Sequence, residues 1–135
     1  MESIKIRYSK SETGWASKSE DGYIVDNVPL TDGLNIGDLV EIAENEDDFP
    51  VINKIIKFRF NNKAAIEYQE IIDYRQIKKE IEDNGGKVEG FFAPSVRDGK
   101  YNKGLAMIAC DQSKKEIKTI LKKYGAKIIN FESRS

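Results

Sequence analysis

Residues 113–125 read SKKEIKTILKKYG, and this stretch decides the fold of the second half of the chain. Ser113 stands three residues before Glu116, which is the spacing of a capping box, where each side chain satisfies a free amide at the start of a helix. Apolar residues then recur at helical spacing, at Ile117, Ile120, Leu121 and Tyr124. Gly125 follows, and glycine ends helices because it adopts the left-handed conformation without steric cost. The stretch predicts a capped amphipathic helix.

A second helix is predicted upstream by the same signals. Asp73 stands three residues before Gln76, Ile77 and Ile81 fall at helical spacing, and Asn84-Gly85 ends the pattern. Extended segments are predicted at 64–72, 87–93, 105–110 and 127–131. The resulting order is strand, helix, strand, strand, helix, strand, which is the split β-α-β or ferredoxin-like order.

The first half of the chain is predicted to form short strands. Ile4, Ile6 and Tyr8 alternate with polar residues, as in a half-buried strand. Asp21-Gly22 is a hairpin signal, and further strands are predicted at 39–42 and 51–60. We therefore predict an α+β fold. Its N-terminal half (1–62) is a small antiparallel β-barrel-like or meander half, packed on a C-terminal ferredoxin-like half (63–135) as one compact unit.

Several short motifs of the chain occur together in a known family. They are Trp15-Ala16, Asp21-Gly22-Tyr23, Asn27-Val28-Pro29, Gly37-Asp38-Leu39-Val40, Gly85-Gly86 and Val88-Glu89-Gly90. With them, the chain resembles the domain of unknown function 4265 family of bacterial proteins over most of its length. The tight turn after Pro29 and the acidic run at 44–48 depart from that pattern. Because the family is uncharacterised, the resemblance implies an arrangement of strands and helices, no activity and no catalytic residues.

Composition excludes much enzyme chemistry. The 135 residues include no histidine and one cysteine, Cys110. Catalytic pairs that need histidine, and nearly all zinc sites, are therefore excluded, and we expect no enzyme activity, cofactor or metal. The formal net charge of -1 gives no overall attraction to nucleic acid or anionic membrane. With no apolar signal segment or membrane-length apolar run, the sequence predicts a cytoplasmic protein.

An acidic run and a single tryptophan are the candidate partner-binding residues. The run contains Glu44, Glu46, Asp47 and Asp48. Its composition fits a solvated loop, and alternatively a patch that attracts a basic protein. Trp15 is either a core anchor or an interface anchor, because tryptophan is enriched at binding hot spots.

A lysine stripe on the 113–125 helix is the alternative candidate site. Lys114, Lys118 and Lys122 recur every four residues. Such a stripe is typical of the solvated side of an amphipathic helix, and phosphate binding is the alternative.

Two further motifs favour structure over chemistry. Gly33 and Gly37, with Asp38, precede a strand and not a helix, so they do not match a phosphate-binding loop. The run from Lys103 to Cys110 falls where an RNA-recognition motif carries stacking aromatics, yet Leu105, Met107 and Cys110 occupy those positions.

From the small size of the chain, the lack of recognisable catalytic residues and the acidic run at 44–48, we expect a non-enzymatic protein-binding module. Its most concrete form is an immunity-type or antitoxin-like protein that neutralises a basic, toxin-like partner by docking. The alternatives are a nucleic-acid-associated regulator that uses the lysine stripe, and a small-molecule-binding regulatory domain.

Overall fold

The computed structural model describes residues 2–91 and 104–134. The chain divides into two compact units, Met1–Phe60 (unit 1) and Asn61–Ser135 (unit 2). The described elements are two helices and mostly antiparallel strands, so the predicted α+β class is confirmed.

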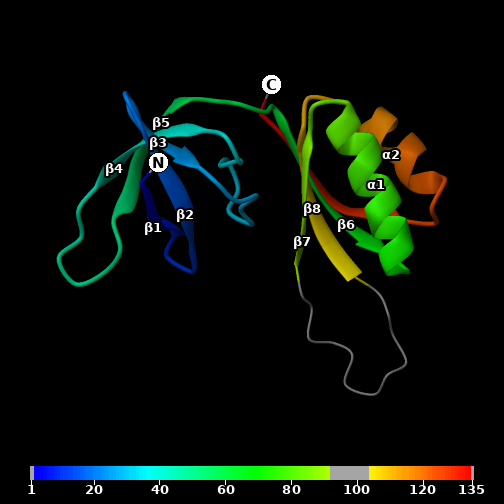
Figure 1. Cartoon of the computed structure of the whole chain (residues 1–135), viewed down its shortest axis with the longest axis horizontal. Helices are drawn as coiled ribbons and strands as arrows, with labels where there is room; N and C mark the ends of the chain where they lie inside the picture. Colours follow the sequence, from blue (N-terminus) through cyan, green and yellow to red (C-terminus); the bar gives the residue numbers. More distant parts are fainter. Residues whose placement is uncertain (1, 92–103, 135) are drawn as a thin grey trace, which may run out of the picture. The chain divides into compact units, whose positions relative to one another are not determined.

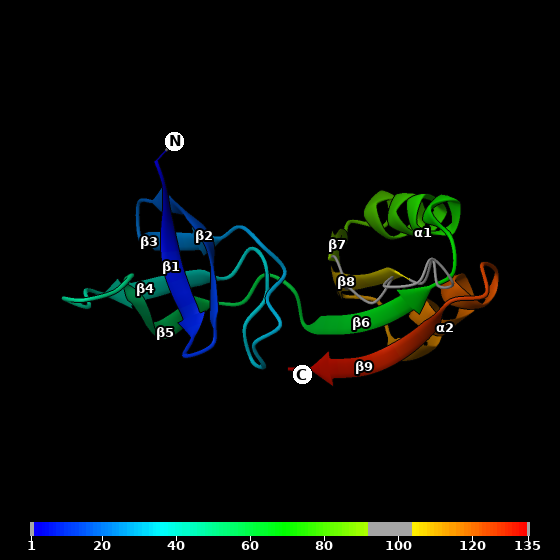
Figure 2. The same ribbon diagram turned by 90° about the horizontal axis from the view of Figure 1, so that it is seen from below.

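Unit 1 is a closed barrel with strand order β1-β2-β3-β4-β5 (Figure 2). Its strands are β1 (Ser3–Ser9), β2 (Glu12–Ser19), β3 (Gly22–Val25), β4 (Leu39–Ala43) and β5 (Val51–Lys57). Consecutive strands are antiparallel, whereas β1 and β5 meet in parallel, with Arg7 opposite Val51. The Arg7 N–H donates to the Pro50 carbonyl over 2.8 Å at this junction.

The barrel core follows the period-2 pattern of β1 and β2. Ile6 and Tyr8 are buried with Ala16, in a cluster that also contains Val25, Leu34 and Val40. Gly14 is needed beside them, since a Cβ there would lie 2.3 Å from the Tyr8 ring. Because side chains alternate along a strand, the residues between these core positions lie on the outer surface of the barrel.

A turn anchored by Asp38 connects β3 to β4. Asp38 is fully buried, and its carboxylate accepts the backbone N–H groups of Asn35 at 2.9 Å and Arg59 at 3.0 Å. Gly37 has φ +83°, a left-handed conformation that favours glycine. The glycines and Asp38 of this segment therefore form a structural turn.

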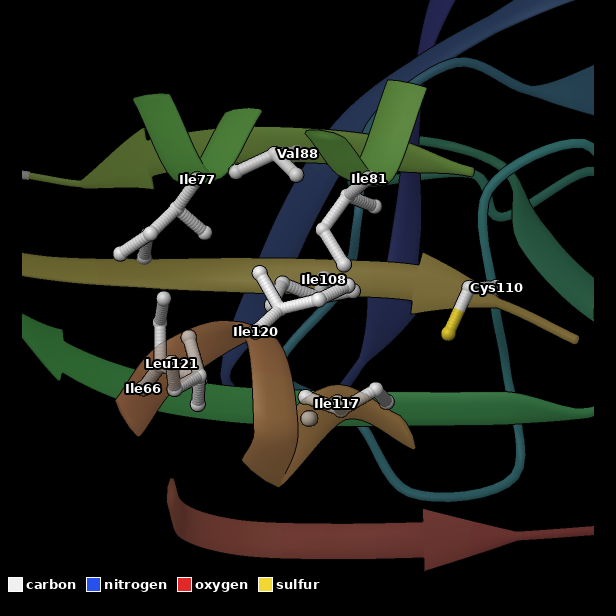
Figure 3. Close-up of a cluster of buried hydrophobic side chains, with 11 residues drawn as sticks. Ile66, Ile77, Ile81, Val88, Ile108, Cys110, Ile117, Ile120 and Leu121 are labelled. Atoms are coloured by element: carbon white, nitrogen blue, oxygen red, sulfur yellow. The ribbon is translucent and has the colours of Figure 1, made fainter. Parts of the chain in front are cut away.

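Unit 2 is a four-stranded antiparallel sheet in the order β7-β8-β6-β9, with both helices on one face (Figure 1). Its elements are β6 (Asn62–Tyr68), α1 (Ile71–Asp83), β7 (Lys87–Phe91), β8 (Gly104–Cys110), α2 (Lys114–Lys122) and β9 (Lys127–Ser133). Ile77 and Ile81 of α1 pack with Ile117 of α2 and Ile108 of β8 in one apolar cluster between the helices and the sheet (Figure 3).

The predicted start of α2 is confirmed, and the predicted start of α1 is wrong. Ser113 and Glu116 make both bonds of the capping box. α1 instead begins at Ile71, after Glu70, whose side chain makes no capping bond. Asp73 lies inside the first turn, where the helix dipole also favours an acidic residue. An acidic residue at this position therefore gives the same sequence signal as a cap residue.

Several predicted strands differ in extent from those of the structure; β9, for example, continues to Ser133, beyond the predicted 127–131. β6 ends at Tyr68, because the apolar pair Ile71-Ile72 forms the exposed first turn of α1 and does not extend the strand. β5 ends at Lys57, short of the predicted 51–60. β7 ends at Phe91 among the described residues, and the remainder of the predicted 87–93 strand lies outside them.

Candidate functional site

The outer surface of β1 and β2 displays the only tryptophan of the chain. Trp15 pairs with Lys5 across these strands, and 49% of it is exposed. Its backbone is fixed: the Trp15 N–H donates to Asn27 over 2.9 Å, and its carbonyl accepts the Tyr8 hydroxyl at 2.6 Å. Trp15 is therefore no core anchor, and it presents an indole on a fixed backbone.

A second exposed aromatic side chain reaches the same surface from the β4–β5 loop. Phe49 is 41% exposed, and the Lys5 ammonium lies 5.6 Å from the centre of its ring. This is within the range of a cation–π contact. Lys5 is thus a neighbour of both Trp15 and Phe49, and the three side chains form one mixed aromatic and cationic surface.

An ion pair fixes the same loop to β1. Arg7 Nε donates to Asp48 Oδ2, while the Phe49 N–H donates to Asp48 Oδ1 over 2.7 Å. The bond from Arg7, followed by that from the Phe49 amide, lowers the pKa of Asp48 below its ordinary value. We call the surface formed by Lys5, Arg7, Trp15, Asp48 and Phe49 the docking face.

Three further carboxylates lie in the β4–β5 loop that carries Asp48 and Phe49. Glu44, Glu46 and Asp47 are exposed, and within residues 2–91 and 104–134 their side chains make no hydrogen bond or ion pair. The four predicted acidic residues therefore differ in their contacts. Asp48 holds the loop to the barrel, and the other three present unpaired negative charge to solvent.

The lysine stripe lies on the exposed side of α2, opposite Ile117 and Leu121, which are buried. The Lys114 ammonium lies 5.9 Å from the centre of the Phe131 ring. Lys118 and Lys122 have no ion-pair partner within the described part of the chain. This is the arrangement of a solvated helix face.

Cys110 lies at the end of the run that resembles an RNA-recognition motif. It is 1% exposed in the core beneath the helices, and burial raises the pKa of its thiol to about 11. It is therefore protonated and unreactive at neutral pH. Met107 is also buried and Leu105 is half-buried, while Lys103, the first residue of the motif, lies outside the described residues.

Lys5, Arg7 and Phe49 were not predicted from the sequence as parts of the site. A signal for the first two was present, because both alternate with the buried Ile6 and Tyr8 and must therefore face outward. No signal linked Phe49 to β1, since their contact depends on how the β4–β5 loop folds back.

The described residues contain no group of three or more side chains suited to holding a metal ion. Among the same residues, neither helix has the length and apolar content needed to cross a membrane. No protein-family model, curated protein or solved structure matches the chain.

Proposed function

We propose that this chain is a non-enzymatic protein-binding module that docks on its partner through the docking face. The observation that carries the proposal is Trp15, which is half-exposed on a backbone fixed by two hydrogen bonds. Tryptophan and arginine are enriched among the residues that dominate binding energy. Here they lie on one surface with Phe49.

The charges around the docking face favour a basic partner. Glu44, Glu46 and Asp47 add exposed carboxylates in the loop that also carries Asp48 and Phe49, and these carboxylates have no ion-pair partner among the described residues. Opposite charges speed the encounter of two proteins and select the correct partner. The most concrete form of the proposal is an immunity-type or antitoxin-like protein that neutralises a basic, toxin-like protein. The absence of histidine from the sequence agrees with a role in binding rather than catalysis.

Preorganisation of the surface also supports docking. The Arg7–Asp48 pair holds the loop that carries Phe49, and the Asn27 and Tyr8 bonds hold the strand that carries Trp15. A surface that is ordered before binding loses less conformational entropy when a partner arrives.

Charge reversal tests the role of the loop. In affinity capture from the native host at near-physiological salt, we expect the wild-type chain to retain a basic protein. Glu44→Lys, Glu46→Lys and Asp47→Lys together should reduce that capture and slow association. The matched control reverses Glu20, Asp21 and Asp32, which are exposed acidic residues elsewhere in unit 1. Equal capture by the two triple variants would exclude the loop as the docking element.

A nucleic-acid-associated regulator is the second candidate, favoured by the exposed lysines of α2. Lys118 and Lys122 have no ion-pair partner within the described residues. This hypothesis predicts RNA or DNA binding whose affinity falls steeply as the salt concentration rises. Binding should be lost on replacing Lys114, Lys118 and Lys122 by glutamine, whereas a similar triple change at Lys18, Lys54 and Lys57 should not affect it.

We also propose the finer assignment of the fold, a small β-barrel half joined to a ferredoxin-like half. For unit 2, the support is the chain order β6-α1-β7-β8-α2-β9 together with the sheet order β7-β8-β6-β9. For unit 1, the support is the pairing of β1 with both β2 and β5. An experimental structure of the whole chain tests both parts of this assignment.

A further inference from the structure

A hollow of about 450 Å³ lies in unit 1 beside the docking face. It is formed by the end of β1, the β1–β2 turn, the β4–β5 loop and the start of β5. Its volume falls within the usual range for small-molecule sites. Arg7 and Asp48 belong to both the docking face and the lining of the hollow, but the docking proposal assigns no ligand to the hollow itself.

The cationic residues that line the hollow have hydrogen-bond donors that the described residues do not use. Arg7 and Lys10 both line it. A guanidinium carries five N–H donors, and among the described residues Arg7 uses one for Asp48 and one for the Lys10 carbonyl, at 3.3 Å. The Lys10 ammonium has no ion-pair partner there. A planar guanidinium with free N–H groups matches the geometry of carboxylate and phosphate oxygens.

Part of the lining is apolar. Val51 and Ile52 of β5 belong to it, and Asn45 of the loop adds an amide. A ligand that suits this lining carries an oxyanion for Arg7 and Lys10 and a small apolar body for Val51 and Ile52. This is the usual composition of a small-molecule site, in which a few polar groups orient a largely apolar ligand.

Asp48 also lines the hollow and shares the Arg7 guanidinium. We propose that the hollow binds a small organic oxyanion, a monophosphate or a carboxylate, through Arg7 and Lys10, in competition with the Asp48 carboxylate. Binding of the anion weakens the contact that holds the β4–β5 loop to β1. The site needs no partner protein, so it stands or falls independently of the docking proposal.

The test is an NMR titration of the whole chain with inorganic phosphate, acetate and adenosine monophosphate, each followed through the backbone amides. We expect saturable shifts at Arg7, Lys10, Asn45 and Asp48. Saturation by phosphate without acetate identifies a phosphate site, and the reverse identifies a carboxylate site. Tighter binding of adenosine monophosphate than of phosphate shows that the ligand body contacts Val51 and Ile52. No saturable shift from any of the three in the millimolar range overturns the proposal.

Single substitutions test the contribution of each cationic residue to anion binding. Lys10→Gln should weaken binding about tenfold or more, because a charge-assisted hydrogen bond is lost. Its control is Lys18→Gln, an exposed lysine that does not line the hollow. Arg7→Lys keeps the charge, removes the planar fork, and should also weaken binding.

Competition gives the decisive comparison. Asp48→Asn should tighten anion binding by removing the competing carboxylate, whereas Asp47→Asn changes the net charge equally without touching Arg7. Equal effects of these two changes, or unchanged binding in Lys10→Gln, would show that the anion does not use this hollow.

Discussion

Asp38 explains why a glycine-rich stretch near the centre of the chain is structural. The stretch offers Gly33, Gly37 and a carboxylate, which are residue types found in ligand-binding loops. In the structure, the carboxylate is buried and accepts the backbone N–H groups of Asn35 and Arg59. The hydrogen-bonding capacity that a ligand would need is directed at the protein backbone.

Removing this carboxylate should destabilise unit 1. Asp38→Ala leaves the buried Asn35 amide and the part-buried Arg59 amide without their acceptor, which costs about 1 to 3 kcal/mol in the free energy of unfolding. Urea unfolding followed by tryptophan fluorescence measures this, because Trp15 is the only tryptophan and lies in unit 1. Asp32→Ala, an exposed change in the same segment, serves as the control. If both variants unfold at the same urea concentration, Asp38 does not anchor the turn.

The two helices differ in whether the capping-box spacing in the sequence marks the true start of the helix. The capping box of α2 is complete, with the Glu116 N–H donating to Ser113 Oγ over 3.1 Å and the Ser113 N–H donating to Glu116 over 3.2 Å. The signal at Asp73 was formally the same, yet α1 begins earlier, at Ile71. Spacing alone does not distinguish a cap residue from an acidic residue of the first turn.

Alanine at the two positions should therefore have unequal effects. Ser113→Ala removes a real cap and should cost about 0.5 to 2 kcal/mol of stability. Asp73→Ala removes only a favourable contact with the helix dipole, which contributes about 0.3 to 1 kcal/mol. Thermal unfolding followed by circular dichroism compares them. A larger loss of stability for Asp73→Ala would restore Asp73 as the cap of α1.

One carboxylate joins α1 to the end of α2 and makes this connection sensitive to pH. Glu80 accepts the Lys123 ammonium over 2.7 Å and also accepts the Tyr124 hydroxyl. These bonds, that from Lys123 first, lower the pKa of Glu80 below its ordinary value of 4.5. The resulting stabilisation is fully present above pH 4.5, the unfolded value, and is lost as the pH falls through the lowered pKa.

Glu80→Gln should therefore lower the melting temperature at neutral pH. The gap to the wild type should close as the pH falls below 4.5. Asp83→Asn is the control, because it breaks the pair with Lys79 on the same helix, where both side chains are more than half exposed. Such pairs contribute about 0 to 1 kcal/mol. A gap for Glu80→Gln that stays constant down to acidic pH would contradict this role.

At the scale of the molecule, local patterns predicted the class and most elements. Alternation identified β1, and helical spacing with a true cap identified α2, because both signals arise within a few residues. The docking face was only partly predictable, since Trp15 and the acidic run are visible in the sequence but their shared neighbours are not. Lys5 contacts Phe49, and Arg7 contacts Asp48, only because β1 meets the loop before β5 when the barrel closes.

The extent of several strands was not predictable because apolar residues can lie in exposed positions. Ile71 and Ile72 are 56% and 58% exposed, yet their composition is that of a strand core. Trp15 is a further example of the same limit, since its residue type favoured the interior and yet it is exposed. Its exposure depends on its outward register in β2.

The most direct test of the docking proposal is a calorimetric comparison of Trp15→Ala with Leu30→Ala, using the purified basic protein that the wild-type chain captures. Leu30 is the matched control, because it is a 59% exposed apolar residue of unit 1 outside the docking face. We predict that Trp15→Ala raises the dissociation constant about thirtyfold, the effect of losing about 2 kcal/mol at a hot spot, and that Leu30→Ala leaves it unchanged. Equal affinities for both variants, or no basic protein captured at near-physiological salt, would contradict the docking proposal.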